Sequence, residues 1–203
     1  VHFKMDDDLT FIRSIYQGKF NSDWVCGEGS YIVSFQSGAF RADSLKAGSA
    51  SVRNVSVDLS GVTDSIKPGE KFQEAEKSVD LSQAEIIVSV GRGIGKEENL
   101  QLVYDLSNAL GAEVASSRPV VDSGWLEPYH QVGSSGQTVA PNLYLALGIS
   151  GAIQHVVGMN GSKNIVAINK DANAPIFEIA DYGVVGDIFE IVPKLITAIQ
   201  GSK

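Results

Sequence analysis

The chain has 203 residues, of which 43% are hydrophobic and 20% are charged, a balance typical of a globular protein rather than a disordered or fibrous one. Sixteen Lys and Arg residues against 24 Asp and Glu residues give a net charge of −8, which disfavours nucleic acid and anionic lipid as partners. The single cysteine, Cys26, excludes an intrachain disulfide and a cysteine-rich metal centre, and no apolar run reaches the roughly 20 residues that span a bilayer.

The first 80 residues are predicted to form a β-rich segment followed by a linker. The chain begins with Val, and residues 1–10 lack the basic and apolar regions of a secretory signal, so we expect no signal peptide and a start partway through a longer protein. Alternating apolar residues between turn residues predict strands at 10–16, 23–27, 30–36 and 51–59. Their candidate buried side chains are Phe11, Ile15, Val33 and Phe35. The polar stretch 60–80 is typical of a linker, with a short helix near 70–77.

Residues 81–203 show a different pattern, in which apolar strands alternate with helices. Strands are predicted at 84–90, 112–117, 143–149 and 164–169, and helices at 98–110, 150–158 and 186–200. Gly111 is placed to end the first of these helices. This alternation predicts an α/β fold, a doubly wound and mostly parallel sheet, preceded by the β-rich segment.

Two segments of the second region carry candidate ligand-binding residues. The glycine-rich turn at 90–95 follows a strand and contains Arg92, which could pair with a phosphate, although a plain tight turn explains the pattern equally well. The long loop from Arg118 to Gly136 has the composition of a binding loop. Within it, Trp125 and Tyr129 could simply pack on the surface, and we expect Asp122 to cap a turn. The loop's polar candidates are Arg118, Gln131, Ser134 and Ser135.

Two further candidate sites follow strand ends. Ser150 is placed as the N-cap of a short helix with Gly151 in its first turn, which would expose backbone N–H groups to an anion. His155 would lie about one turn into that helix, and an isolated histidine is more often structural, as we expect for His2 and His130. Asn169 ends a strand where α/β sheets bind ligands, whereas Asp187 is either a ligand contact or the N-cap of the last helix.

The sequence lacks the motifs of a hydrolase or a metal site. There is no GxSxG, HExxH or EF-hand pattern, and Cys26 lies far from the candidate histidine. The candidate site residues carry hydroxyls, amides, one arginine and one histidine. Such groups are better suited to binding a ligand than to cleaving its bonds.

Most of residues 80–200 resembles the FAD-binding domain of electron transfer flavoprotein alpha subunits. The motifs that carry the resemblance are GRG (91–93), SRPVVDSGW (117–125), QVGSSGQTVAPNLYLALGISGAIQHVVGM (131–159), IVAINKDANAPIF (165–177) and ADYGVVGD (180–187). The resemblance implies that residues 81–203 form a Rossmann-like FAD-binding domain and that residues 1–80 hold the C-terminal strands of a first domain plus a linker. The family usually has QVGQTG where this chain has QVGSSG, which changes one contact to the ribityl chain.

The resemblance also implies contacts to FAD. Arg92, Ser117 and Arg118 would contact the cofactor, with the Arg118 guanidinium over the flavin ring, and Gln131 would begin the neighbouring segment. Val132, Gly133, Ser134 and Ser135 would run along the flavin and ribityl chain. Ser150, Gly151, Ala152, Ile153, Gln154 and His155 would wrap the ribityl and pyrophosphate groups, with His155 near the flavin O2, where a negative flavin would favour its protonated form. Asn169, Asp187 and Ile188 would hold the adenosine end.

The function implied by the resemblance is electron transfer without substrate chemistry of its own. An electron transfer flavoprotein beta subunit would be the partner, and electrons would pass singly from flavin dehydrogenases, such as the acyl-CoA dehydrogenases of fatty acid β-oxidation, to a quinone reductase. The expected location is the cytoplasm, or the mitochondrial matrix in a eukaryote. Two alternatives stay open: an electron-bifurcating or nitrogen-fixation-type alpha subunit coupled to NADH and ferredoxin, and an α/β domain that binds a nucleotide but no flavin.

Overall fold

The computed structural model contains two sheets, and the first is a small antiparallel sheet near the N-terminus. The structure describes residues 2–5, 8–16, 19–35, 39–40, 46–49, 51–58, 60–61, 69 and 79–201. The sheet has the order β1-β2-β3, with β1 at His2–Met5, β2 at Leu9–Ile15 and β3 at Phe20–Val25. β2 and β3 confirm the strands predicted near 10–16 and 23–27, whereas β1 was not predicted.

Two other strands predicted in this region are wrong. Residues 30–35 and 51–58 contain no strand, and the side chains of Val33 and Phe35 are 41% and 42% exposed. A strand is stable only when a neighbour satisfies its backbone groups, and none of the described residues pairs with these segments. The helix predicted near 70–77 lies outside the described residues.

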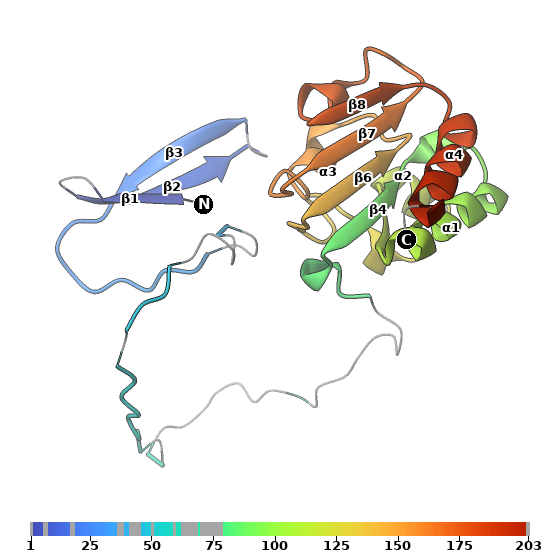
Figure 1. The fold of residues 1–203 in the computed structure, drawn as a ribbon. Helices are drawn as coiled ribbons and strands as arrows, with labels where there is room; N and C mark the ends of the chain where they lie inside the picture. Colours follow the sequence, from blue (N-terminus) through green and yellow to red (C-terminus); the bar gives the residue numbers. More distant parts are fainter. Residues whose placement is uncertain are drawn as a thin grey trace.

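The second sheet has five parallel strands and confirms the predicted doubly wound fold (Figure 1). The strands are β4 (Ile86–Val90), β5 (Glu113–Ser116), β6 (Leu143–Leu147), β7 (Ile165–Asn169) and β8 (Tyr182–Val185). Their order is β5-β4-β6-β7-β8, so the chain moves outward from β4 to β5 and then returns to the other side of β4 to form β6. The strand order therefore reverses between β4 and β6.

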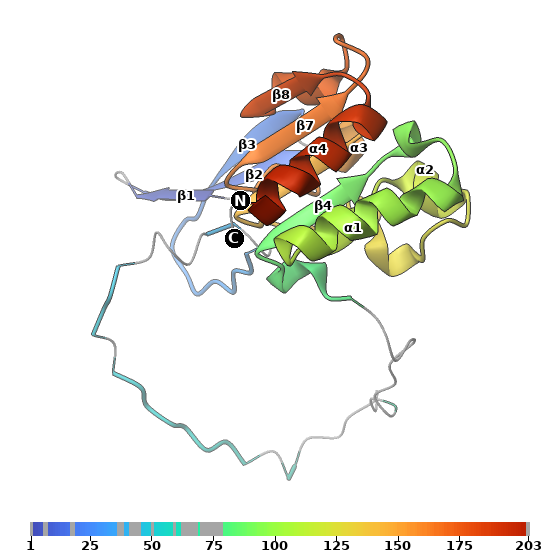
Figure 2. The ribbon, with the colours of Figure 1, turned by 45° about the vertical axis from the view of Figure 1, so that its right-hand side comes forward.

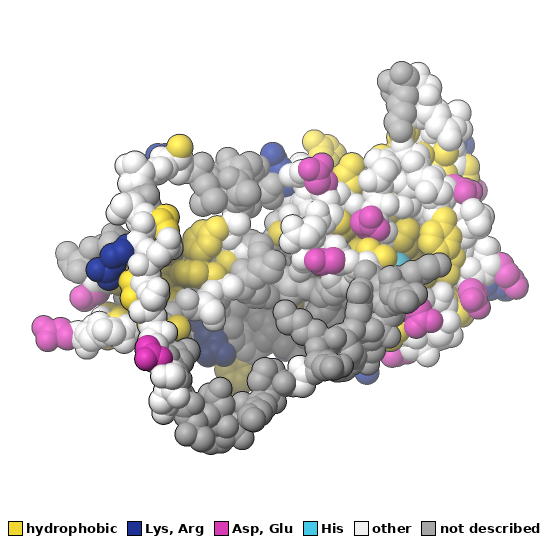
Figure 3. All heavy atoms as spheres, turned by 90° about the horizontal axis from the view of Figure 1, so that it is seen from below, with side chains coloured by type: hydrophobic (Ala, Val, Ile, Leu, Met, Phe, Trp, Pro, Cys, Tyr) yellow, Lys and Arg dark blue, Asp and Glu magenta, His cyan; other side chains and the backbone are white. Residues whose placement is uncertain are grey.

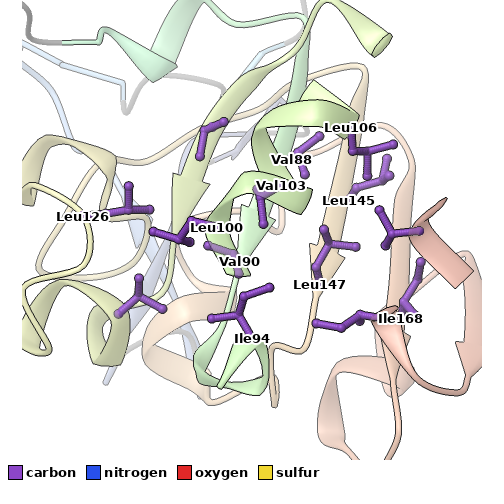
Figure 4. Packing of buried hydrophobic residues seen from close by; sticks show 14 residues of the cluster. Val88, Val90, Ile94, Leu100, Val103, Leu106, Leu126, Leu145, Leu147 and Ile168 are labelled. Carbon is purple, nitrogen blue, oxygen red and sulfur yellow. The ribbon is translucent and has the colours of Figure 1, made fainter. Parts of the chain in front are cut away.

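Two long helices cover one face of this sheet. α1 (Leu100–Leu110) and α4 (Ile188–Gly201) lie side by side there (Figure 2), and α1 ends at Gly111, which has a φ of 66°. Figure 4 shows apolar side chains of α1 and the sheet pointing toward one another. The other face is covered by loops and by the short helix α3 (Ile153–Val156).

The remaining helical segments are short. They are α2 (Arg118–Asp122), η2 (Leu81–Gln83), η3 (Arg92–Ile94), η4 (Glu97–Asn99), η5 (Pro128–His130) and η6 (Pro175–Glu178). No helix within the described part of the chain is long and apolar enough to cross a membrane. Acidic side chains are spread among apolar and polar ones on the face seen in Figure 3, in keeping with the net negative charge.

One side chain ties the start of this α/β unit to its long loop. The Gln137 amide oxygen accepts a hydrogen bond from the Leu81 N–H at 3.1 Å, and its amide nitrogen donates to the backbone carbonyls of Val79 and Tyr129. These bonds hold the buried Leu81 against the hydrophobic cluster on the sheet face that the loops and α3 cover.

We expect Gln137→Leu to lower the free energy of unfolding by about 2–4 kcal/mol, because three hydrogen bonds are lost and their backbone partners are left unpaired. The measurement is urea unfolding followed by circular dichroism. Gln101→Leu is the matched control, since the exposed Gln101 side chain donates a hydrogen bond to Asp105 on its own helix and bonds to no other described residue. Equal losses for the two variants would contradict this role of Gln137.

Candidate functional site

The site lies where the strand order reverses, at the carboxyl ends of β4 and β6. There the Gly91 N–H donates to the Leu147 carbonyl at 2.8 Å and the Gly93 N–H donates to the Gly148 carbonyl at 3.1 Å. A Cβ on Gly91 would lie 2.3 Å from the Gly148 oxygen, so a side chain at residue 91 is excluded by the neighbouring backbone. Because the connections after the two strands leave in opposite directions, a crevice opens at this point.

A cavity of about 860 Å³ occupies the crevice. It is lined by most of the residues that the sequence proposes for cofactor binding. These are Arg92, Ser117, Arg118, Gln131, Val132, Gly133, Ser134, Ser135, Ser150, Ala152, Gln154, His155 and Asn169. The structure thus brings together residues that are up to 77 positions apart in the chain.

Four of the proposed residues do not line the cavity. Gly151 packs against the backbone of Ile176, and Ile153 begins α3 and is partly exposed. Asp187 accepts a hydrogen bond from the Phe189 N–H at 2.8 Å, which confirms its interpretation as the N-cap of α4, and Ile188 is buried in the core beneath that helix. Contacts of these four residues with a cofactor stay predictions.

The cavity also contains residues that were not proposed. They are Gly91, Gly93, Pro119, Asp122, Gly148, Ile149, Asp171, Ala174 and Pro175. The signal for the glycines was present, since GRG and LGIS both follow apolar strands. Asp122 was expected only to cap a turn, and the position of Asp122 and Asp171 in the cavity depends on contacts that the sequence does not display.

Arg118 stands at the start of α2 with its side chain largely exposed. Residues 118–122 form this helix, so the expectation of an uninterrupted loop is wrong here. Asp122 does not cap a turn as expected: its carboxylate lies 3.4 Å from the Arg118 Nε, one helical turn away. Both side chains are more than 60% exposed, so the ion pair is weak and leaves the guanidinium available to a ligand.

The segment 131–136 is held against the backbone that precedes His155. The Ser134 N–H donates to the Gln154 carbonyl at 2.7 Å, and a Cβ on Gly133 would lie 2.7 Å from that same oxygen. The Gln131 amide nitrogen donates to the Ser135 hydroxyl at 3.0 Å. The side chains of Ser134 and Ser135 remain exposed at the cavity wall.

The predicted helix start at Ser150 is wrong. α3 begins at Ile153, with Ala152 at its N-cap, because the Ser150 carbonyl accepts a hydrogen bond from the Ile176 N–H and Gly151 has a φ of 89°. α3 has four residues, too few for a helix dipole to bind an anion strongly. His155 is accordingly in its first turn and not beyond it.

His155 is 6% exposed, and its Nε2 lies 2.9 Å from the Tyr144 hydroxyl. Its Nδ1 is buried and has no hydrogen-bond partner among the described residues. Burial lowers the pKa of His155 to about 4, and the backbone of Val132 opposes this shift. The imidazole is therefore neutral at pH 7 in the free chain.

Asn169 and His130 have structural partners. The Asn169 amide nitrogen donates to the Ile149 carbonyl at 2.9 Å and its amide oxygen accepts from the Asp171 N–H at 3.0 Å, which fixes the ends of β6 and β7. The His130 Nδ1 lies 2.7 Å from the Val114 carbonyl and does not line the cavity, in agreement with the structural role expected for it. No cluster of three potential metal ligands occurs among the residues that the structure describes.

Residues 80–160 match the family model described as the electron transfer flavoprotein FAD-binding domain. The chain belongs to the electron transfer flavoprotein alpha-subunit family. It is 44% identical over 192 residues to the electron transfer flavoprotein subunit alpha of Pseudomonas aeruginosa, which covers 94% of this chain and 61% of the relative. It is 42% identical over 190 residues to Protein FixB of Clostridium saccharobutylicum, which covers 93% of this chain and 57% of the relative.

A third relative matches over a shorter span with higher identity. The electron transfer flavoprotein subunit alpha of Mycobacterium leprae is 55% identical over 124 residues, which covers 61% of this chain and 39% of the relative. The chain thus spans 39–61% of the length of these three curated relatives.

Proposed function

We propose that residues 81–203 form the FAD-binding domain of an electron transfer flavoprotein alpha subunit, preceded in residues 1–80 by the last strands of a first domain and a linker. The observation that carries this proposal is the cavity at the reversal of strand order, lined by most of the residues that the family resemblance assigns to FAD. In open α/β sheets, ligands bind in the crevice where the strand order reverses.

The residues present fit such a cofactor in size and shape. A cavity of about 860 Å³ is within the range of about 300–1,000 Å³ usual for small-molecule sites. Its floor is glycine backbone from two strand ends, Gly91, Gly93 and Gly148, which lets a flat or extended ligand approach closely. A dinucleotide needs both features, a long crevice and a backbone that admits its pyrophosphate.

The donors present also fit. Arg92 and Arg118 present guanidinium groups to an anionic ligand, and the exposed hydroxyls of Ser134 and Ser135 can donate to ring or ribityl atoms. His155 offers a neutral imidazole on the same wall, and Asn169 is held rigid by its own hydrogen bonds. When bound, FAD would supply the one-electron chemistry that none of these side chains provides.

The same chain would serve as an electron carrier and not as an enzyme. Its cavity residues would bind and orient a cofactor that carries the electrons. We propose an electron transfer flavoprotein beta subunit as its partner, flavin dehydrogenases as donors and a quinone reductase as acceptor, in the cytoplasm. One FAD per heterodimer is expected, whereas two would favour the electron-bifurcating alternative.

The test of cofactor binding is a titration of the whole chain, alone and with a beta subunit, by FAD. Flavin fluorescence and the visible spectrum report binding. Saturable binding of FAD supports the proposal, and FMN or AMP serves to show which part of the molecule is recognised. Failure of the chain to bind FAD even with the beta subunit present would overturn it.

We expect Arg118→Ala to weaken FAD binding about 10- to 100-fold, because one charge-assisted contact of about 1.5–3 kcal/mol is lost. Fluorescence titration under the same conditions measures the change. Arg13→Ala is the matched control, since Arg13 is an exposed arginine on β2 that does not line the cavity. An unchanged affinity for Arg118→Ala would exclude the guanidinium from the binding site.

A further inference from the structure

Two buried side chains with hydroxyl groups, Ser89 and Tyr144, lie outside the cavity that His155 lines. Ser89 on β4 and Tyr144 on β6 are on adjacent strands and face the same side of the sheet, and both are completely buried. The Tyr144 hydroxyl lies 2.9 Å from the His155 Nε2. His155 lines the cavity, but Ser89 and Tyr144 do not.

These three side chains are neutral. Burial raises the pKa of Tyr144 well above its usual value, and the neighbouring Ser89 side chain acts in the opposite direction. Burial lowers the pKa of His155, and no charged side chain contributes to that shift, although Arg92, Arg118, Asp122 and Asp171 line the same cavity. The Tyr144–His155 contact is therefore a hydrogen bond between neutral groups, and its direction sets the histidine tautomer.

The surroundings favour one direction. A phenol O–H is a stronger hydrogen-bond donor than a neutral imidazole N–H, so the 2.9 Å contact favours donation from Tyr144 to Nε2 and places the imidazole proton on Nδ1. With the proton on Nδ1, Nε2 is a lone-pair acceptor and the Tyr144 O–H must donate to it. The Tyr144 oxygen is then free to accept a hydrogen bond. The Ser89 hydroxyl has no hydrogen-bond partner among the described residues and is buried on the same face of the adjacent strand, which makes it the candidate donor.

We propose that Tyr144, oriented by Ser89, is a positioning residue that fixes the ring orientation and the Nδ1–H tautomer of His155 at the cavity wall. The effect of this arrangement on a cofactor rests on the proposed function, because His155 would face a bound molecule only if FAD binds in the cavity. The arrangement of Ser89, Tyr144 and His155 concerns the free chain and is testable without FAD. A fixed tautomer decides which imidazole atoms can donate to a ligand and which can accept from it.

The experiment measures the tautomer of His155 by ¹⁵N NMR of the ¹⁵N-histidine-labelled whole chain at pH 7. The wild type is expected to show the Nδ1–H form. Tyr144→Phe keeps the ring and removes the hydroxyl, and should shift the tautomer ratio toward Nε2–H about two- to tenfold, the range of one hydrogen bond. Ser89→Ala should shift the ratio in the same direction by a smaller factor.

Ser116→Ala is the matched control. Ser116 is also a buried serine with an unpaired hydroxyl, on the neighbouring strand β5, but it takes no part in the contact with His155. Its substitution should leave the tautomer ratio unchanged. A wild-type Nε2–H form, or a Tyr144→Phe variant with the wild-type ratio, would overturn the proposal.

A second measurement separates this proposal from the proposed function. Each variant is titrated with FAD, and Tyr144→Phe should bind about two- to tenfold more weakly than the wild type while Ser116→Ala does not. If the wild-type chain and its complex bind no FAD but the tautomer shifts as stated, the proposed function fails and the positioning role stands. If FAD binds but the tautomer is indifferent to Tyr144, the positioning role fails alone.

Discussion

Gly91→Ala is expected to lower the free energy of unfolding by about 3 kcal/mol or more. The added Cβ would lie 2.3 Å from the Gly148 oxygen and 2.8 Å from the Gly148 carbonyl carbon and the Ile149 Cα, all of them backbone atoms that cannot rotate away. Relief requires β4 and β6 to separate at the point where Gly91 bonds to Leu147. Overpacking costs about 1–3 kcal/mol and each lost hydrogen bond about 0.5–1.5 kcal/mol. Urea unfolding followed by circular dichroism measures the loss.

Two control variants separate this steric clash from backbone strain and from the general effect of replacing a glycine. Gly91 has a φ of −105°, which alanine adopts freely, so conformational strain does not contribute. Gly111→Ala introduces backbone strain without a clash, since Gly111 has a φ of 66° and nothing lies within 4 Å of the new Cβ. It should lower the free energy of unfolding by about 1–2 kcal/mol. Gly201→Ala meets neither obstacle. If Gly91→Ala were no worse than Gly201→Ala, the close approach that forms the floor of the cavity would be refuted.

Four of the five strands of the parallel sheet were predicted, because their signals are local, whereas β8 was not. Residues 84–90 form a nearly continuous apolar run, as expected for a strand covered on both faces, and β4 is found there. Leu100, Val103 and Leu106 follow helical spacing, and all three are buried residues of α1. Near the N-terminus the same reasoning failed at 30–35, because alternation of apolar residues shows that a strand is possible but does not supply a partner strand.

The candidate site likewise contains features that the sequence predicted and features that it did not. Most of the polar residues that follow β4, β5 and β6 were found from the sequence, because a parallel sheet brings all carboxyl strand ends to one edge. The start of α3 was not, because it depends on the hydrogen bond between Ser150 and Ile176, 26 residues apart. Tyr144 was hidden for a similar reason: in sequence it is one more apolar residue of a strand, and only the fold places its hydroxyl against His155.

His155 is expected to make the fold sensitive to acid in a defined window. Its pKa is about 4 in the folded chain against 6.5 for the ordinary side chain, so below pH 6.5 the unfolded chain binds a proton that the folded chain does not. The contribution of His155 to the free energy of unfolding is therefore fully present above pH 6.5. It falls as the pH is lowered toward 4 and does not change further below pH 4. The difference in pKa corresponds to about 3 kcal/mol.

The measurement is the free energy of unfolding in urea at pH values between 7 and 4. His155→Gln should flatten the decline between pH 6.5 and 4, because no group at that position then takes up a proton on unfolding. His130→Gln is the matched control, since it removes a histidine outside the cavity and leaves His155 in place. A wild-type decline that persists in full in His155→Gln would mean that the imidazole beside Tyr144 is not held neutral. The hydrogen bond from the Tyr144 hydroxyl to Nε2 would then be lost below pH 6.5, because an imidazolium has no lone pair on Nε2 to accept it.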